Sequence, residues 1–146
     1  MWYRIFCASE TTPAPAATLQ RLNDLAPVAG HFHGDEEGWF RAELVVAETT
    51  LMLERFLSRE EGVRAELNIW AAHLETCGDG PEHVRLMERM IQTRQLFTLE
   101  RSDQASSLDN ICVALCRWLA ETTDGVYQID GQGFFAADGA QLVRDE

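Results

Sequence analysis

The chain has 146 residues, the size of one ordinary domain, and we expect a single domain spanning residues 1–146. It carries 24 acidic residues against 12 basic ones, a formal net charge of −12, which excludes binding to nucleic acid and disfavours anionic membranes. All twelve basic residues are arginine, so the composition also excludes enzymes that form a lysine Schiff base and nucleotide-binding P-loops.

The chain begins with a predicted strand and a short predicted helix. Residues 2–8 are aromatic and β-branched, which is typical of a strand. Leu19, Leu22 and Leu25 then recur on one face of a helix, which Pro27 ends.

The next segment predicts further strands. Short strands are expected over residues 28–33 and 39–46, separated by an acidic, glycine-containing turn. In the second of these, four alternate residues should share a face: Phe40, Ala42, Leu44 and Val46. Residues 51–57 alternate in the same way, with Arg55 among the leucines, although a helix over residues 50–57 also fits the pattern.

Two neighbouring helices are expected next. Ser58 and Glu61 have the spacing of a capping box, so the first helix should begin at Ser58 and end near Gly78. Its buried residues are expected at helical spacing: Val63, Leu67, Trp70 and Leu74. Pro81 opens the second helix, and the short loop makes the pair antiparallel. The buried stripe of the second helix is expected at Val84, Met87 and Ile91, with Leu86 and Met90 beside it.

The last third predicts one helix followed by a β meander. The segment 102–107 should lead into the helix, with Ser106 or Ser107 as its cap, and Gly125 should end it. Its buried face is expected to hold four large apolar residues: Ile111, Leu115, Trp118 and Leu119. Cys112 and Cys116 are four residues apart, so they share a face and are expected to be small buried residues. Two Asp-Gly pairs then mark turns between short strands.

Grouped strands and grouped helices predict the α+β class. We expect a small antiparallel sheet, made of the N-terminal strands plus the C-terminal β meander and covered by about four helices. No apolar run approaches the roughly 20 residues of a membrane helix, and the first residues do not have the pattern of a secretory signal. The expected location is therefore the cytoplasm.

Two histidines form the strongest candidate for a metal site. His31 and His33 would project from the same face of a strand, so their imidazoles could share one divalent metal, with Asp35 or Glu37 adding an oxygen ligand. Further ligands could come from residues that the sequence does not place: Glu66, His73, Glu75 and His83. The alternative is a surface hairpin with solvated histidines beside an acidic turn. No other cofactor is expected.

Motifs of nucleophilic catalysis are absent. The sequence contains no G-x-S-x-G motif and no familiar catalytic pattern of cysteine and histidine. Glu66 and His73 are seven residues apart and roughly share a helical face, which suits either general acid–base work or a solvated surface. The sequence therefore assigns no catalytic residue.

The sequence is compatible with three functions. The first is a non-enzymatic, acidic interaction or regulatory domain that binds a basic protein partner or associates with itself. The second is a small metal- or ligand-dependent enzyme built on His31, His33 and the neighbouring acids. The third is a small-molecule sensor with a pocket between the sheet and the helices.

Overall fold

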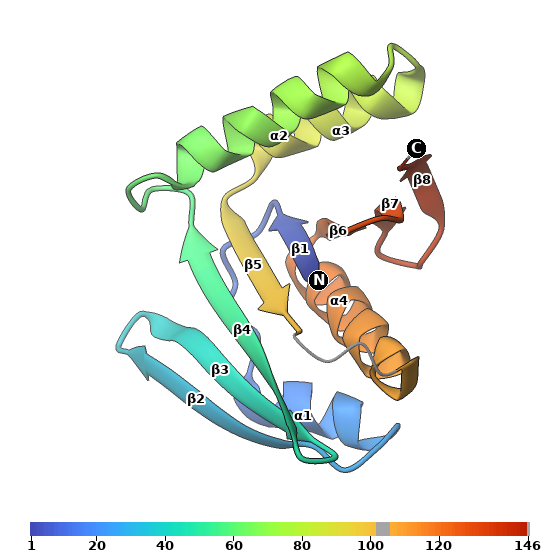
Figure 1. Cartoon of the computed structure of the whole chain (residues 1–146). Helices are drawn as coiled ribbons and strands as arrows, with labels where there is room; N and C mark the ends of the chain where they lie inside the picture. The colour runs from blue at the N-terminus through green and yellow to red at the C-terminus, as the bar shows by residue number, and fades with distance from the viewer. Residues whose placement is uncertain (102–105, 146) are drawn as a thin grey trace.

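The computed structural model describes residues 1–101 and 106–145, and these form a single sheet with helices on both faces (Figure 1). The described strands are β1 (Trp2–Cys7), β2 (Ala29–Asp35), β3 (Gly38–Val46), β4 (Thr49–Leu57), β5 (Gln95–Glu100), β6 (Gly125–Ile129), β7 (Gly133–Ala136) and β8 (Gln141–Arg144). The described helices are α1 (Pro15–Asn23), α2 (Val63–Cys77), α3 (Pro81–Gln92) and α4 (Asp109–Thr123), with a 3-10 turn η1 (Ser106–Leu108) before α4.

The eight described strands are all paired antiparallel, in the order β2-β3-β4-β5-β1-β6-β7-β8. N-terminal strands and a C-terminal meander therefore share one sheet, and four helices cover it, so the predicted α+β class is confirmed. Residues 51–57 form a strand and not a helix. Among the described residues, no helix has both the length and the apolar character needed to cross a membrane.

The larger core lies between one face of the sheet and helices α1 and α4. Ile5 and Leu53 from the sheet meet Leu115 from α4, and all three are fully buried. Cys112 and Cys116 are buried in the same core, as their spacing predicts. Burial holds the pKa of the Cys116 thiol well above its usual value, so this pair serves as packing material.

The smaller core lies on the other face, beneath the antiparallel pair α2 and α3. In Figure 1 these two helices lie side by side across the upper ends of the strands. Their buried residues pack on Phe6, Leu96 and Val126 of the sheet. The predicted stripe of α3 is wrong at two of its three positions: Val84 and Ile91 are 48% and 63% exposed, whereas Met87 packs against this core beside the buried Leu86 and Met90.

Three other sequence predictions need correction. A central strand, β5, separates α3 from α4, so the helices are not grouped as expected. Helix α2 begins at Val63 after Gly62, whose positive φ of 83° turns the chain, and Ser58 does not cap it. Ser106 and Ser107 form η1 and do not cap α4, and residues 102–105 of the predicted leader lie outside the described part.

A β-bulge changes the predicted face pattern of β3. His33 pairs with Arg41, but the next residue of β2 pairs with Trp39, so Phe40 is an extra residue in its strand. Such a bulge reverses the alternation of side chains. Trp39 consequently enters the core, and Phe40, which the simple alternation places inside, is 51% exposed.

Candidate functional site

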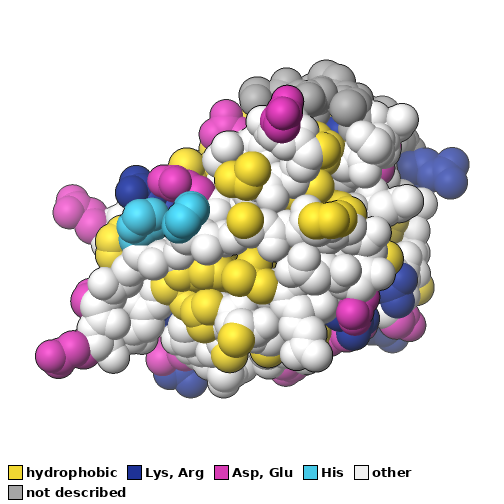
Figure 2. Space-filling model, turned by 90° about the horizontal axis from the view of Figure 1, so that it is seen from below, with side chains coloured by type: hydrophobic (Ala, Val, Ile, Leu, Met, Phe, Trp, Pro, Cys, Tyr) yellow, Lys and Arg dark blue, Asp and Glu magenta, His cyan; other side chains and the backbone are white. Residues whose placement is uncertain are grey.

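The histidines of the predicted metal site lie on β2, at one edge of the sheet. His31 and His33 project from the same face of the strand, and His33 Nε2 lies 3.7 Å from Glu43 Oε1 on β3. Figure 2 shows two histidine side chains side by side on the lower face, with acidic and basic side chains next to them. Alternation along the strand therefore places both imidazoles on one face of β2.

The acids predicted to complete that site have other partners. Asp35 Oδ1 accepts a hydrogen bond of 2.9 Å from the backbone N–H of Glu37, and Glu37 Oε2 lies 3.4 Å from Arg59 Nη2. Within residues 1–101 and 106–145, no group of three or more His, Cys, Asp or Glu side chains is arranged to hold a metal ion. Metal binding by His31 and His33 stays a prediction.

A second candidate site lies on the sheet face that α2 and α3 cover only in part. Along β1, Phe6 lies beneath the helices and is fully buried, whereas Arg4 and Trp2, two and four residues earlier, retain exposed surface. Alternation puts all three on one face. The helical pair thus ends over the sheet and leaves a hollow beside the first turn of α2.

This hollow, the sheet-face pocket, has a volume of about 360 Å³. That volume falls in the range of small-ligand sites, roughly 300–1,000 Å³. Strands β1, β4 and β5 form its floor, and the turn before α2 forms its wall. Its lining residues are Trp2, Arg4, Glu54, Phe56, Glu61, Gly62, Val63, Glu66, Leu96 and Thr98.

Arg4 is the one basic residue among those that line the pocket, and its charge is already compensated. Its Nη1 donates hydrogen bonds of 2.9 Å to Gln128 Oε1 and 2.8 Å to Asp130 Oδ1. Its guanidinium also lies 4.8 Å from the ring centroid of Trp70 and 5.9 Å from that of Trp2. Burial alone would raise the pKa of Asp130, but hydrogen bonds from Gln128 and Arg4 outweigh it and lower that pKa. Asp130 is therefore the counter-ion of Arg4.

Three glutamates give the pocket its charge. Glu66 Oε1 accepts a hydrogen bond of 3.2 Å from Trp70 Nε1. Within the described part of the chain, Glu54 and Glu61 form no ion pair. With Arg4 compensated by Asp130, the pocket is an anionic hollow with the aromatic side chains of Trp2 and Phe56 on its floor. A cation with an apolar stem matches it in charge and polarity.

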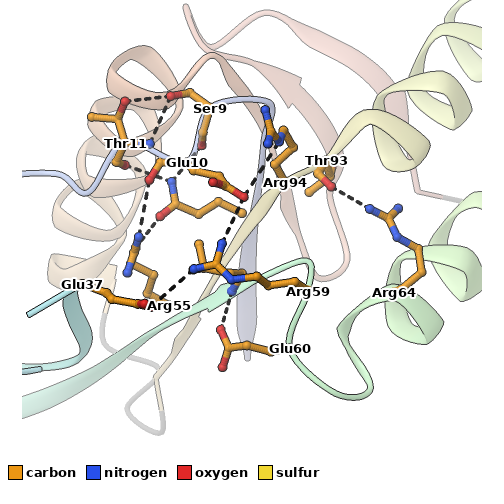
Figure 3. A network of polar contacts seen from close by, with 12 residues as sticks. Ser9, Glu10, Thr11, Glu37, Arg55, Arg59, Glu60, Arg64, Thr93 and Arg94 are labelled. Carbon is orange, nitrogen blue, oxygen red and sulfur yellow. Dashed lines mark hydrogen bonds and ion pairs between the residues drawn. The ribbon is translucent and has the colours of Figure 1, made fainter. Parts of the chain in front are cut away.

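A polar network holds the wall of the pocket in place (Figure 3). Arg59 Nη1 lies 3.5 Å from Glu10 Oε1, and Arg94 Nε lies 3.8 Å from the same oxygen. Glu60 accepts a hydrogen bond from the backbone N–H of Leu57 and closes the turn after β4. Glu61 and Gly62 follow directly in this turn, so the network positions the segment that borders the pocket.

Helix α2 is fixed to the end of α3 by one arginine near its start. Arg64 donates three hydrogen bonds to backbone carbonyls, of 3.4 Å to Met90, 3.2 Å to Ile91 and 3.0 Å to Thr93. Figure 3 shows the bond to Thr93. The three bonds satisfy carbonyl groups at the C-terminal end of α3. The first turn of α2, which carries Val63 and Glu66 into the pocket, is thereby held on the sheet.

Comparison with protein-family models, with curated proteins and with solved structures finds no match in any of the three. The function must therefore be argued from the site itself.

The remaining predicted site residues divide between two cavities. Glu66 lines the sheet-face pocket, whereas His73 and His83 line a second cavity at the other end of α2, and Glu75 lines neither. The structure therefore does not bring Glu66 and His73 together in one cavity. The sequence analysis missed Trp2, Arg4 and Phe56. Alternation on β1, with an arginine between aromatic residues of one strand face, is the signal that was available.

Proposed function

We propose that this chain is an acidic protein-interaction domain, and that the sheet-face pocket binds a basic side chain of a partner protein. The observation that carries the proposal is the lining of the pocket: aromatic side chains together with the carboxylates of Glu54 and Glu61, which form no ion pair with any residue that the structure describes. An arginine side chain fits this combination, because its planar guanidinium stacks on aromatic rings and pairs with carboxylates.

The molecule already contains an example of the proposed contact. On the same sheet face, Arg4 stacks over Trp70 and pairs with Asp130. In the adjacent sheet-face pocket, a partner arginine would repeat this arrangement: it would stack on Trp2 or Phe56 and pair with the carboxylate of Glu54. Each such stacking contact contributes about 0.5–2 kcal/mol.

The charge of the whole chain supports a protein partner. A net charge of −12 repels nucleic acid and attracts a basic protein over a distance of about 8–10 Å at physiological salt. The expected cytoplasmic location belongs to the same proposal. Affinity for such a partner should fall as the salt concentration rises.

A peptide experiment tests the proposal directly. Short peptides in which one arginine is flanked by leucines would be titrated against the protein, with glutamate replacing arginine in a matched series. We expect binding of the arginine series alone, weakened about tenfold by Glu54→Gln, since a charge-assisted hydrogen bond contributes about 1.5 kcal/mol. Trp2 and Phe56 remain in place in that variant.

Glu88→Gln provides the control, because it removes one negative charge from an exposed position of α3 outside the pocket. Equal losses from Glu54→Gln and Glu88→Gln would show that only net charge matters. Equal binding of the arginine and glutamate peptides would contradict the proposal.

A further inference from the structure

The second cavity, of about 760 Å³, contains an exposed thiol. It lies between the turn that joins α2 to α3 and the C-terminal hairpin β7–β8. Its lining includes the apolar side chains of Leu74 and Phe134 as well as Cys77, His73 and His83.

Cys77 is paired with an imidazole one helical turn earlier on α2. Its Sγ lies 3.4 Å from Nε2 and 3.8 Å from Nδ1 of His73. The ring of His73 packs edge-on against Trp70, with 5.6 Å between the ring centroids. This contact orients the imidazole toward the thiol. An imidazole at this distance is a base for the thiol proton, and the thiolate is the reactive form of cysteine.

The turn after Cys77 brings a second imidazole to the cavity. A Cβ atom at Gly78 would lie only 2.9 Å from Cε1 and 3.0 Å from Nε2 of His83, so the ring packs directly on the glycine backbone. Across the cavity, Arg144 of β8 and Asp145 provide the other charged groups. The thiol is therefore bordered by nitrogen bases on its own side.

The other cysteines are separated from this site by the sheet. Cys7, Cys112 and Cys116 are buried in the core beneath α1 and α4. Burial raises the pKa of Cys7 to about 12. Thiol chemistry is thus confined to Cys77, and no second cysteine is placed to displace a group attached there.

We propose that Cys77 is a modification site that exchanges with low-molecular-weight disulfides, with His73 as the base. His73 takes the thiol proton, and Sγ attacks one sulfur of the disulfide. A new S–S bond joins Cys77 to that sulfur, the original S–S bond breaks, and the other half leaves as a thiolate that takes the proton from His73. Cys77 is oxidised and the leaving sulfur is reduced, so the disulfide itself is the oxidant. The cavity accommodates the attached half.

Oxidised glutathione is the probe, and intact-protein mass spectrometry follows the mixed disulfide. We expect one adduct on the wild-type protein and none on Cys77→Ser. His73→Gln should form the same adduct about tenfold more slowly near neutral pH, because it lacks the base. In strongly alkaline solution the two rates should converge, since hydroxide then removes the thiol proton. A purely structural role of His73 would not produce this convergence.

Glu88→Gln is the control, since it changes an exposed side chain of α3 outside this cavity, and its rate should equal that of the wild type. The proposal is overturned if His73→Gln reacts as fast as the wild type near neutral pH. It is equally overturned if the adduct forms on Cys7, Cys112 or Cys116.

Discussion

Replacing Arg55 with methionine should destabilise the fold by about 3 kcal/mol, which is a large effect for one polar residue. Arg55 lies on the buried face of β4 and is 7% exposed. It donates from Nε to Gln95 Oε1, from Nη1 to the Trp39 carbonyl at 3.1 Å, and from Nη2 to the Glu10 carbonyl at 3.4 Å. Burial lowers the pKa of the guanidinium, as expected for a cation surrounded by neutral acceptors.

The magnitude follows from the acceptors that would lose their donor. Gln95 is fully buried, and the Nη1 bond to Trp39 is buried as well. Each buried acceptor left without a partner costs about 1–3 kcal/mol. Methionine fills part of the volume and removes the desolvation cost of the cation, which offsets some of this loss. A net loss of about 3 kcal/mol corresponds to a fall of about 9 °C in Tm for a chain of this length.

Urea unfolding followed by circular dichroism measures this change. Arg59→Met is the control, because Arg59 is 57% exposed and its two ion pairs should contribute less than about 1 kcal/mol. Adding Gln95→Leu to Arg55→Met should lower the stability further, because Gln95 Nε2 also donates hydrogen bonds of 2.9 Å to the Ser9 carbonyl and 3.0 Å to the Thr11 carbonyl. Arg55→Met with the stability of the wild type would refute the reasoning that the guanidinium satisfies buried acceptors.

Three further outcomes are expected. Gly133→Ala should destabilise the β7–β8 hairpin by more than about 2 kcal/mol in thermal unfolding, because φ is +121° there and a Cβ would lie 2.0 Å from the Val143 carbonyl oxygen. Asp130→Asn should cost about 1 kcal/mol at neutral pH, since its carboxylate is 40% exposed. The lowered pKa of Asp130 makes this contribution present above the unfolded pKa, so the difference should vanish in urea titrations as the pH falls through the folded pKa. If His31 and His33 bind Zn²⁺, adding it in excess should raise the Tm of the wild type and not of His33→Gln; an unchanged Tm would remove the metal prediction.

The spacing of apolar residues correctly predicted the elements that bury only one side. The i,i+4 spacing of Cys112 and Cys116 predicted a shared buried face, and α4 buries both. Alternation over residues 51–57 likewise predicted one buried face of β4, with Arg55 included. Each of these segments has one buried side, so its periodicity is visible in the sequence.

Strand β5 was missed because it lies in the middle of the sheet. It pairs with β4 on one side and β1 on the other, and Leu96, Phe97 and Leu99 are buried on alternate faces beneath both helical layers. A strand buried on both faces shows an apolar run without alternation, which resembles the end of the preceding helix.

Because β5 was not predicted, the sheet-face pocket was not predicted either. Its floor takes Arg4 from β1 and Glu54 from β4, and β5 supplies Leu96 between them. Without β5, nothing in the sequence places β1 near β4. The pair of His73 and Cys77, in contrast, is visible as an i,i+4 spacing, but only the fold shows that a cavity lies in front of it.

Trp70 lies between the sheet-face pocket and the cavity at Cys77. The two sites are therefore neighbours, but they remain separate. The ring of Trp70 packs on Phe6 at 6.0 Å and on Phe134 at 5.9 Å, with Arg4 over it at 4.8 Å and His73 at its edge at 5.6 Å. Because the Trp70 ring is packed on several sides, it has a single arrangement. Coupling between two sites requires an element that has two arrangements. Partner binding at the sheet-face pocket and exchange at Cys77 therefore rest on separate contacts, and either proposal can fail while the other stands.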